Sequence, residues 1–262
     1  MSAPVPFLAP PPPRFRLPQV ALTVALAAVV ILGVIAVFRK GTLPAVDEID
    51  PGLLAEPVQR PTTRETFSFE YRGVTYDVEP VAEYEIQGLV VAHNDTSSIG
   101  DVYHDSSSVD TKDVGMIWGD NLRTDDFRKC EYRSGSWTCY VEWPAGVKFH
   151  LDSMSNTHIV TGDDEVRGEV GRIRVGDQVR LTGLLVNYRD GRRPDSWRRS
   201  STVRQDTGNG ACEVMFLEEI EFLDRGTPVW YLVYELAWWL APAILVAKGV
   251  LWMIGFRASR AR

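Results

Sequence analysis

Two long apolar runs, one near each end of the 262-residue chain, constrain its possible folds more than any other feature of the sequence. The first run covers residues 20–38, contains no charge and ends at Phe38-Arg39-Lys40. At a rise of about 1.5 Å per residue, a helix of this length spans about 28 Å, close to the hydrocarbon thickness of a bilayer. The second run covers 229–256 and has Trp and Tyr residues near its ends, as interfacial aromatic belts do. We therefore predict two transmembrane helices, 20–38 and 229–256, embedded in a lipid bilayer.

The flanks of these runs predict how the chain is oriented in the membrane. The tail 257–262 contains three arginines, and basic segments beside a membrane span tend to remain in the cytoplasm. Two spans then place the Pro-rich leader, 1–19, in the cytoplasm as well and the segment between the spans outside it. A cleaved signal peptide is the alternative for the first run, but the apolar cores of such peptides are shorter, about 7–15 residues. We expect an uncleaved anchor in the inner membrane of a cell envelope.

The chain between the two runs is acidic and long enough for one folded domain. Residues 41–228 contain 34 acidic and 20 basic side chains, a net charge of −14, whereas the rest of the chain carries +7. Because binding to nucleic acid depends on neutralising phosphates, the acidic charge argues against nucleic acid as a partner. The segment 39–66 is rich in Pro and acids without periodicity, which predicts an extended extracytoplasmic linker before a β domain over 67–224.

Alternation of apolar and polar residues predicts that this domain is mainly β. In the segment 67–78 the alternation is interrupted at Arg72-Gly73, which is typical of a tight hairpin turn. A strand follows at 84–91, where Gly88 indicates a bend or bulge. Short apolar runs bounded by turn formers predict further strands, which we place at 116–118, 137–143, 178–188 and 212–223.

One short helix is expected outside the apolar runs, since Val166, Val170 and Ile173 share a helical face after the capping sequence 161–164. A glycine-bearing first strand, further strands, this helix, then GDQVRLTG and a closing strand form an order that resembles the oligonucleotide/oligosaccharide-binding (OB) barrel. The segments SNTHIV, VRGEVGRIRVGDQVRLTGLLV and STVRQDTGNGACEVMFLEEIE also resemble uncharacterised bacterial membrane-anchored proteins of this plan, a resemblance that implies no activity. The expected fold is an OB-like small β-barrel flanked by two transmembrane helices, with a β-sandwich as the alternative.

The chain contains three cysteines, Cys130, Cys139 and Cys212. The first two bracket an expected hairpin, CEYRSGSWTC, in a compartment where disulfides persist. We predict a Cys130–Cys139 disulfide, with two reduced thiols as the alternative. Cys212 is left over and is expected to be buried near the start of the last strand, with a reactive thiol as its other interpretation.

An arginine-rich stretch, YRDGRRPDSWRRSSTVRQ, stands out in the acidic domain. In an OB arrangement it forms the connection between the fourth and fifth strands, a rim often used for binding. Arginine together with tryptophan suits phosphate, anionic polysaccharide or lipid headgroups. The alternative is a solvated hairpin whose arginines balance the acids of the domain. The candidate ligand-binding residues are Arg192, Arg193, Trp197, Arg198 and Arg199.

The loop HNDTSSIGDVYHDSSSVDTKD concentrates carboxylates and two histidines. Oxygen-rich loops bind Ca²⁺, and His with Asp can hold a transition metal, but the spacing does not match an EF-hand. A solvated loop is therefore the alternative. The candidate metal ligands are His93, Asp95, His104 and Asp105. Further along, we expect His158 to be a turn residue, with a base or a metal ligand as its other interpretations.

The sequence contains no nucleophile elbow, phosphate-binding loop or HExxH motif, and no cofactor is predicted. The preferred hypothesis is a non-enzymatic envelope protein whose OB-like domain binds a membrane or envelope protein partner or an anionic glycan. The alternative hypothesis is a metal-dependent hydrolase built from the loop with His93, Asp95, His104 and Asp105.

Overall fold

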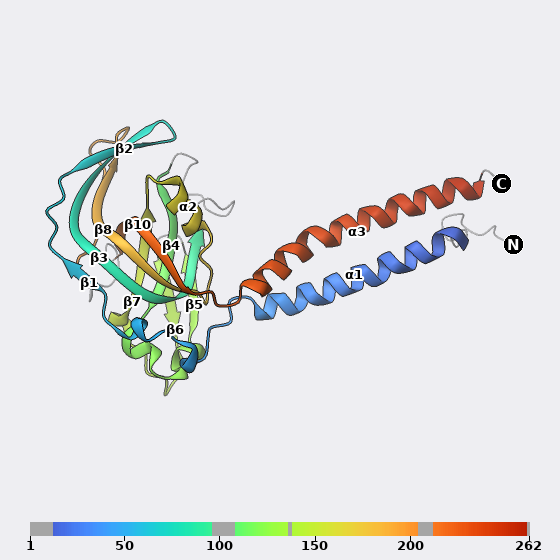
Figure 1. Ribbon diagram of the computed structural model, residues 1–262, viewed down its shortest axis with the longest axis horizontal. Helices are drawn as coiled ribbons and strands as arrows, with labels where there is room; N and C mark the ends of the chain where they lie inside the picture. The colour runs from blue at the N-terminus through green and yellow to red at the C-terminus, as the bar shows by residue number, and fades with distance from the viewer. Residues whose placement is uncertain (1–12, 96–107, 136–137, 204–211, 261–262) are drawn as a thin grey trace. The chain divides into compact units, whose positions relative to one another are not determined.

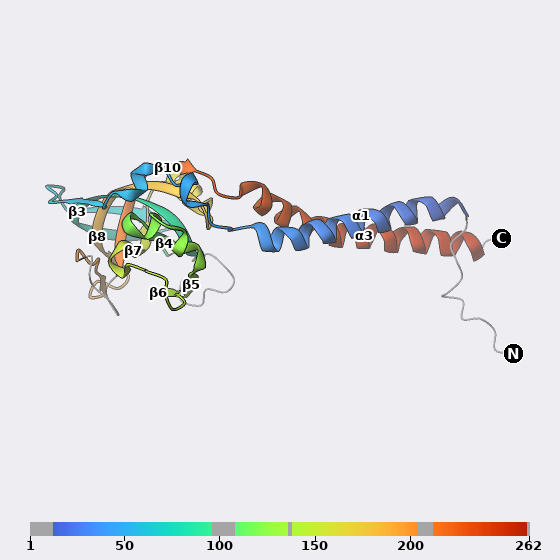
Figure 2. The ribbon, with the colours of Figure 1, turned by 90° about the horizontal axis from the view of Figure 1, so that it is seen from below.

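The computed structural model describes residues 13–95, 108–135, 138–203 and 212–260. It divides into two compact units, Gly41–Gly226 and a second unit made of Met1–Lys40 with Thr227–Arg262. In the second unit, α1 (Pro13–Arg39) and α3 (Pro228–Arg260) run side by side (Figure 1 and Figure 2). Both helices are long and apolar enough to cross a membrane, over Arg16–Arg39 and Pro228–Ala258.

Small and polar side chains join these two helices. A Cβ atom added at Gly33 would lie 3.0 Å from the Cβ of Ala237, so this glycine permits a close approach of the helices. Gln19 Nε2 donates to the carbonyl oxygen of Lys248 at 3.1 Å, and Lys248 Nζ donates to Thr23 Oγ1. A polar residue in an apolar helix is costly unless it is paired, and here the neighbouring helix provides the partners.

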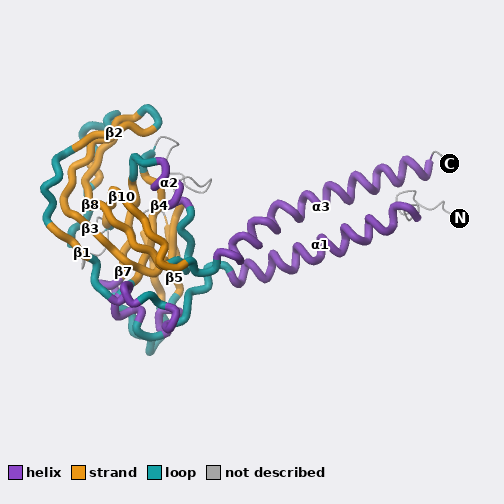
Figure 3. Tube along the Cα trace, in the orientation of Figure 1, coloured by secondary structure: helices purple, strands orange, loops and turns teal. Residues whose placement is uncertain are grey.

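The other unit is mainly β (Figure 3). In the described part of this unit, eight strands form one mixed sheet, and β5 and β6 form a separate two-stranded sheet. The strands are β1 (Val58–Arg60), β2 (Phe67–Tyr71), β3 (Val74–Asp95), β4 (Asp110–Ile117), β5 (Glu131–Gly135), β6 (Thr138–Glu142), β7 (Met154–Val160), β8 (Gln178–Asp190), β9 (Trp197–Arg198) and β10 (Glu213–Asp224). The short helices are α2 (Asp164–Gly171) and the 3₁₀ segments η2 (Val46–Glu48), η3 (Pro51–Leu54), η4 (Gly119–Leu122), η5 (Asp125–Lys129) and η6 (Leu151–Ser153).

Hydrogen bonds between strands run around a ring, from β3 through β4, β7, β10 and β8 back to β3. The long strand β3 makes this possible, because its C-terminal part pairs with β4 while its earlier part pairs with β8. Most neighbours in the ring are antiparallel, but β10 runs parallel to β7. The prediction of a mainly β domain is confirmed, and the eight strands belong to one sheet rather than to the two sheets of a sandwich.

Local sequence signals produced the expected turn and helix. In the β2–β3 hairpin, Arg72 and Gly73 have φ angles of 48° and 77°, the positive values that a two-residue hairpin turn requires. Helix α2 begins after Asp163, whose Oδ1 accepts hydrogen bonds from the backbone N–H groups of Glu165 and Val166 at 2.7 and 3.1 Å. The main buried cluster joins α2 to all the ring strands, with Val170, Ile86, Val114, Ile159, Leu181 and Met215 among its members.

The segment 39–66 differs from the predicted extended linker. It contains η2, η3 and strand β1, which pairs with β3. Leu53 is fully buried in a cluster with Leu89 and Ile117, and the Asp50 N–H donates to Gln178 Oε1 at 2.7 Å. Pro51 begins one of the two short 3₁₀ turns, and such turns have neither a helical nor a strand period, so a folded segment looked like a spacer.

Candidate functional site

Polar side chains gather on one face of the sheet where β4, β7 and the start of β10 are neighbours. The pairing of β4 with β7 sets Asp113 opposite His158. Because side chains alternate along a strand, Asn156 and His158 of β7 point to the same face. Cys212 precedes β10, which runs parallel to β7, and its thiol lies within reach of Asn156.

These side chains place a carboxylate, an imidazole and a thiol next to one another. His158 Nδ1 lies 2.5 Å from Asp113 Oδ1, and both side chains are almost completely buried. The imidazole of His158 also lies close enough to the thiol of Cys212 for each group to affect the pKa of the other. Asn156 Nδ2 donates to Cys212 Sγ at 3.5 Å. We call Asp113, Asn156, His158 and Cys212 the thiol site.

The environment of the thiol site favours charge separation between the thiol and the imidazole. Burial alone lowers the pKa of His158, but the Asp113 carboxylate and the neighbouring Cys212 thiol outweigh burial and raise this pKa to about 9. Burial raises the pKa of Cys212, but the neighbouring His158 and the hydrogen bond from Asn156 outweigh burial and leave the pKa below its usual value. The arrangement therefore favours ionisation of the Cys212 thiol.

A second thiol lies close to this site. A Cβ atom added at Gly115 of β4 would lie 2.5 Å from Sγ of Cys139, which belongs to β6. Because Gly115 has no side chain, the Cys139 thiol can occupy this space. Gly115 is paired with Asn156, which donates to Cys212. Burial, followed by the charge of Cys212, raises the pKa of Cys139 to about 12. Cys139 is therefore a protonated thiol beside a site that stabilises a thiolate.

The predicted Cys130–Cys139 disulfide is not formed, and all three cysteines are reduced. In the β5–β6 hairpin, Cys139 is opposite Ser134, four positions along the chain from Cys130. Four strand positions correspond to about 13 Å, which is beyond the Cα separation that a disulfide tolerates. Cys130 instead lies at the end of η5, where its Sγ donates to the Asp126 carbonyl oxygen at 3.5 Å.

The arginine-rich stretch is only partly available for a ligand. Arg189 Nε donates to Asp77 Oδ2 at 2.8 Å, and its guanidinium lies 4.9 Å from the ring centre of Trp197, which is half-buried. Arg192 donates through Nε and Nη2 to the carboxylate of Asp190. These contacts match the alternative in which arginines balance acids of the same domain.

Three more arginines of this stretch have different surroundings, and Arg204 lies outside the described residues. Arg193 and Arg199 are exposed to solvent. Arg198 is half-buried on β9, and its charge acts on both His158 and Tyr188. The structure therefore brings Arg198 near the thiol site and leaves Arg193 and Arg199 at the surface.

The candidate metal ligands are not brought together in the described part of the chain. His104 and Asp105 lie outside the described residues. His93 and Asp95 both lie on β3, where burial and the charge of Lys112 lower the pKa of His93 to about 4. Among the described residues, no group of three or more His, Cys, Asp or Glu side chains is arranged to hold a metal ion. A cationic neighbour such as Lys112 opposes metal binding at His93.

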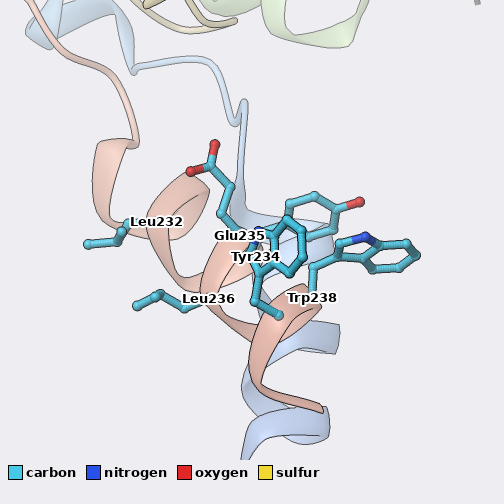
Figure 4. A pocket seen from close by; sticks show the side chains of 6 residues that line it. Leu232, Tyr234, Glu235, Leu236 and Trp238 are labelled. Carbon is cyan, nitrogen blue, oxygen red and sulfur yellow. The ribbon is translucent and has the colours of Figure 1, made fainter. Parts of the chain in front are cut away.

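A shallow recess on α3 has a different character. Its lining comes from one helix alone and consists of Leu232, Tyr234, Glu235, Leu236, Trp238 and Trp239 (Figure 4). The side chains of Trp238 and Trp239 are 72% and 75% exposed. Large exposed aromatic side chains on an apolar helix suit contact with lipid. The recess thus belongs to the surface that we expect lipid to cover.

Sequence reasoning overlooked the thiol site. The prediction that His158 is a turn residue is wrong, because it lies within β7. Asn156 and His158, two positions apart in SNTHIV, signal one face of a strand. Their contacts with Asp113 and Cys212 depend on the pairing of three strands distant in sequence, which one chain does not reveal. No known protein family, no curated protein and no solved structure matches this chain.

Proposed function

We propose that this chain is a two-pass membrane protein of a cell envelope, with both termini in the cytoplasm and the β domain outside it. Two helices of sufficient length and apolarity support the crossing. The arginines of the 257–262 tail support the orientation through the positive-inside tendency. Lipid contact also accounts for the exposed Trp238 and Trp239 on α3.

We further propose that the β domain is an OB-like barrel. Its support is the ring order β3–β4–β7–β10–β8, with helix α2 between β7 and β8 in the chain. In an OB barrel, five strands close in a Greek-key order, and ligands bind on the face of the second and third strands beside the connections from the first to the second and from the fourth to the fifth strand. In this chain the second and third ring strands are β4 and β7, and the two connections are those from β3 to β4 and from β8 to β10.

The function that this arrangement supports best is binding of an anionic glycan by the β8–β10 connection. The observation that carries the proposal is the exposure of Arg193 and Arg199 on this connection, in a domain that is otherwise strongly acidic. Guanidinium groups bind carboxylates and sulfates through charge-assisted, often bidentate hydrogen bonds. An acidic protein partner is the second reading, because its carboxylates offer the same acceptors.

The double variant Arg193→Ser/Arg199→Ser is expected to bind a soluble polyanion such as polygalacturonate about tenfold or more weakly, because charge-assisted hydrogen bonds are lost. Its free energy of unfolding should change by less than about 1 kcal/mol per site, since both side chains are exposed. Titration calorimetry of the full chain in detergent measures the first quantity, and denaturant unfolding measures the second.

The matched control is Arg123→Ser/Arg128→Ser, which removes the same charge from exposed ion pairs with Asp120 and Asp125. If this control weakens polygalacturonate binding equally, the effect is one of net charge and the proposed rim is wrong. A cross-linked protein neighbour that is lost only in the Arg193/Arg199 variant would assign a protein partner instead.

Orientation is tested with single cysteines placed in a background without the natural ones. The variant Asp195→Cys introduces a thiol at an exposed position of the β domain, and Arg260→Cys introduces one beyond the second span. In whole cells we expect a membrane-impermeant maleimide to label position 195 and to leave position 260 unlabelled. The reverse labelling would place the β domain in the cytoplasm.

A further inference from the structure

The thiol site has the parts of an activated nucleophile. In such sites a carboxylate orients an imidazole, and the imidazole accepts the proton of the attacking group. Asp113 Oδ1 lies 2.5 Å from His158 Nδ1, and the imidazole of His158 lies near the thiol of Cys212. Asn156 Nδ2 donates a hydrogen bond to the same sulfur at 3.5 Å. None of these four side chains takes part in the proposed glycan binding, so either proposal can fail without the other.

We propose that Cys212 is the nucleophile of a thiol exchange site whose substrate is a disulfide and whose second thiol is Cys139. The position of Cys139 favours this chemistry over acyl transfer, which needs no second thiol. The Cys139 sulfur lies against Gly115 on β4. Gly115 is paired with Asn156 of β7, and the side chain of Asn156 contacts Cys212. Both cysteines are half-buried rather than fully enclosed.

The charged and titratable groups around Cys212 come from five strands, including β7, which carries His158. Asp113 on β4 and Glu213 on β10 carry negative charge, and Arg198 on β9 carries positive charge. Asp113 is hydrogen-bonded to His158 and holds the imidazole protonated, which outweighs the opposing effects of burial and of Arg198. Cys139 on β6 remains protonated at neutral pH because burial raises its pKa. Cys212 therefore has the lowered pKa that suits an attacking thiol, and Cys139 has the raised pKa of a thiol that stays protonated until it resolves the mixed disulfide.

The exchange occurs in two displacements. The Cys212 thiolate attacks one sulfur of the substrate disulfide, the S–S bond breaks, and the leaving substrate thiolate takes the proton from the His158 imidazolium. Cys139 then transfers its proton to His158 and attacks Cys212 Sγ in the mixed disulfide. A Cys139–Cys212 disulfide forms, and the second substrate thiolate leaves and is protonated by His158. Two electrons pass from the cysteine pair to the substrate, which is reduced to two thiols.

Glutathione disulfide is the probe, used with the full chain in detergent and followed by acid quenching and peptide mass mapping. We expect the wild-type protein to form a Cys139–Cys212 disulfide. The Cys139→Ser variant should accumulate glutathione on Cys212, because the resolving thiol is missing. Cys130, whose pKa burial raises, serves as the internal comparison and should react about tenfold or more slowly than Cys212.

The variants His158→Gln and Asp113→Asn test the activation of Cys212. Both should slow its alkylation by iodoacetamide at neutral pH about tenfold or more and move the midpoint of the pH profile upward. The wild-type protein tests the same point without a substitution. The midpoint of the pH profile for alkylation of Cys212 should lie below the midpoint for Cys130 in the same molecules.

Three results would overturn the proposal. One is a Cys212 that reacts with iodoacetamide no faster than Cys130 in the wild-type chain. Another is a Cys139→Ser variant that accumulates no mixed disulfide on Cys212. The third is rapid acylation of Cys212 by p-nitrophenyl acetate without any reaction with glutathione disulfide, which would assign acyl transfer to this site.

Discussion

The variant Asp113→Asn is expected to destabilise the β domain by about 3–5 kcal/mol near neutral pH, because it removes one partner of a buried ion pair. Asp113 and His158 are almost completely buried, so solvent cannot replace the missing partner. Denaturant unfolding of the full chain, followed by tryptophan fluorescence at several pH values, measures this loss. The pH dependence separates loss of the ion pair from a general packing defect.

The direction of the pH dependence follows from the raised pKa of His158. This pKa is about 9 in the folded protein, against the usual 6.5, so the stabilisation is complete below pH 6.5 and is lost as the pH rises through 9. The shift corresponds to about 3 kcal/mol at 1.36 kcal/mol per pKa unit. In the variant, burial keeps the imidazole neutral, so the cost of the substitution should be about 3 kcal/mol smaller near pH 10 than near pH 6.

The comparison must be made between variant and wild type rather than on the wild type alone. Lys112 has a pKa lowered to about 8 by burial, so its own contribution to stability rises with pH above 8 and opposes that of His158. Taking the difference between two proteins that share Lys112 cancels this contribution. The control Asp125→Asn removes an exposed carboxylate paired with Arg128 and should cost less than about 1 kcal/mol at either pH. A cost for Asp113→Asn that does not change with pH would mean that His158 is neutral in the fold.

The fold was predictable wherever one short segment contained the whole signal. The hairpin turn at Arg72-Gly73 and the capping of α2 by Asp163 depend on a few neighbouring residues, and both are found in the structure. The two apolar helices depend on length and composition alone. The order of strands around the ring needs contacts between segments as distant as β3 and β8, and no local pattern in one chain encodes them.

The site was less predictable, because register decides which side chains meet. The disulfide prediction assumed that Cys130 and Cys139 are opposite each other in a hairpin, whereas the turn sets Ser134 opposite Cys139. The same dependence on register hid the contact of Asp113 with His158, since the two residues are adjacent only after β4 pairs with β7. Residue type identified Cys212 as a possible reactive thiol, but its hydrogen-bond partners required the tertiary structure.

The last prediction concerns the segment 39–66. A spacer and a packed segment should differ in how much a substitution within them lowers the free energy of unfolding. Leu53 is fully buried in a cluster that includes Leu89 and Ile117, so Leu53→Ala should lower the free energy of unfolding by about 2–5 kcal/mol. The control Leu151→Ala makes the same substitution at a side chain that is 54% exposed and should cost about 0.5 kcal/mol or less. Equal and small losses in the two variants would mean that 39–66 is a spacer after all. A large loss confined to Leu53→Ala would mean that the stability of the β domain depends on the segment 39–66, which follows α1.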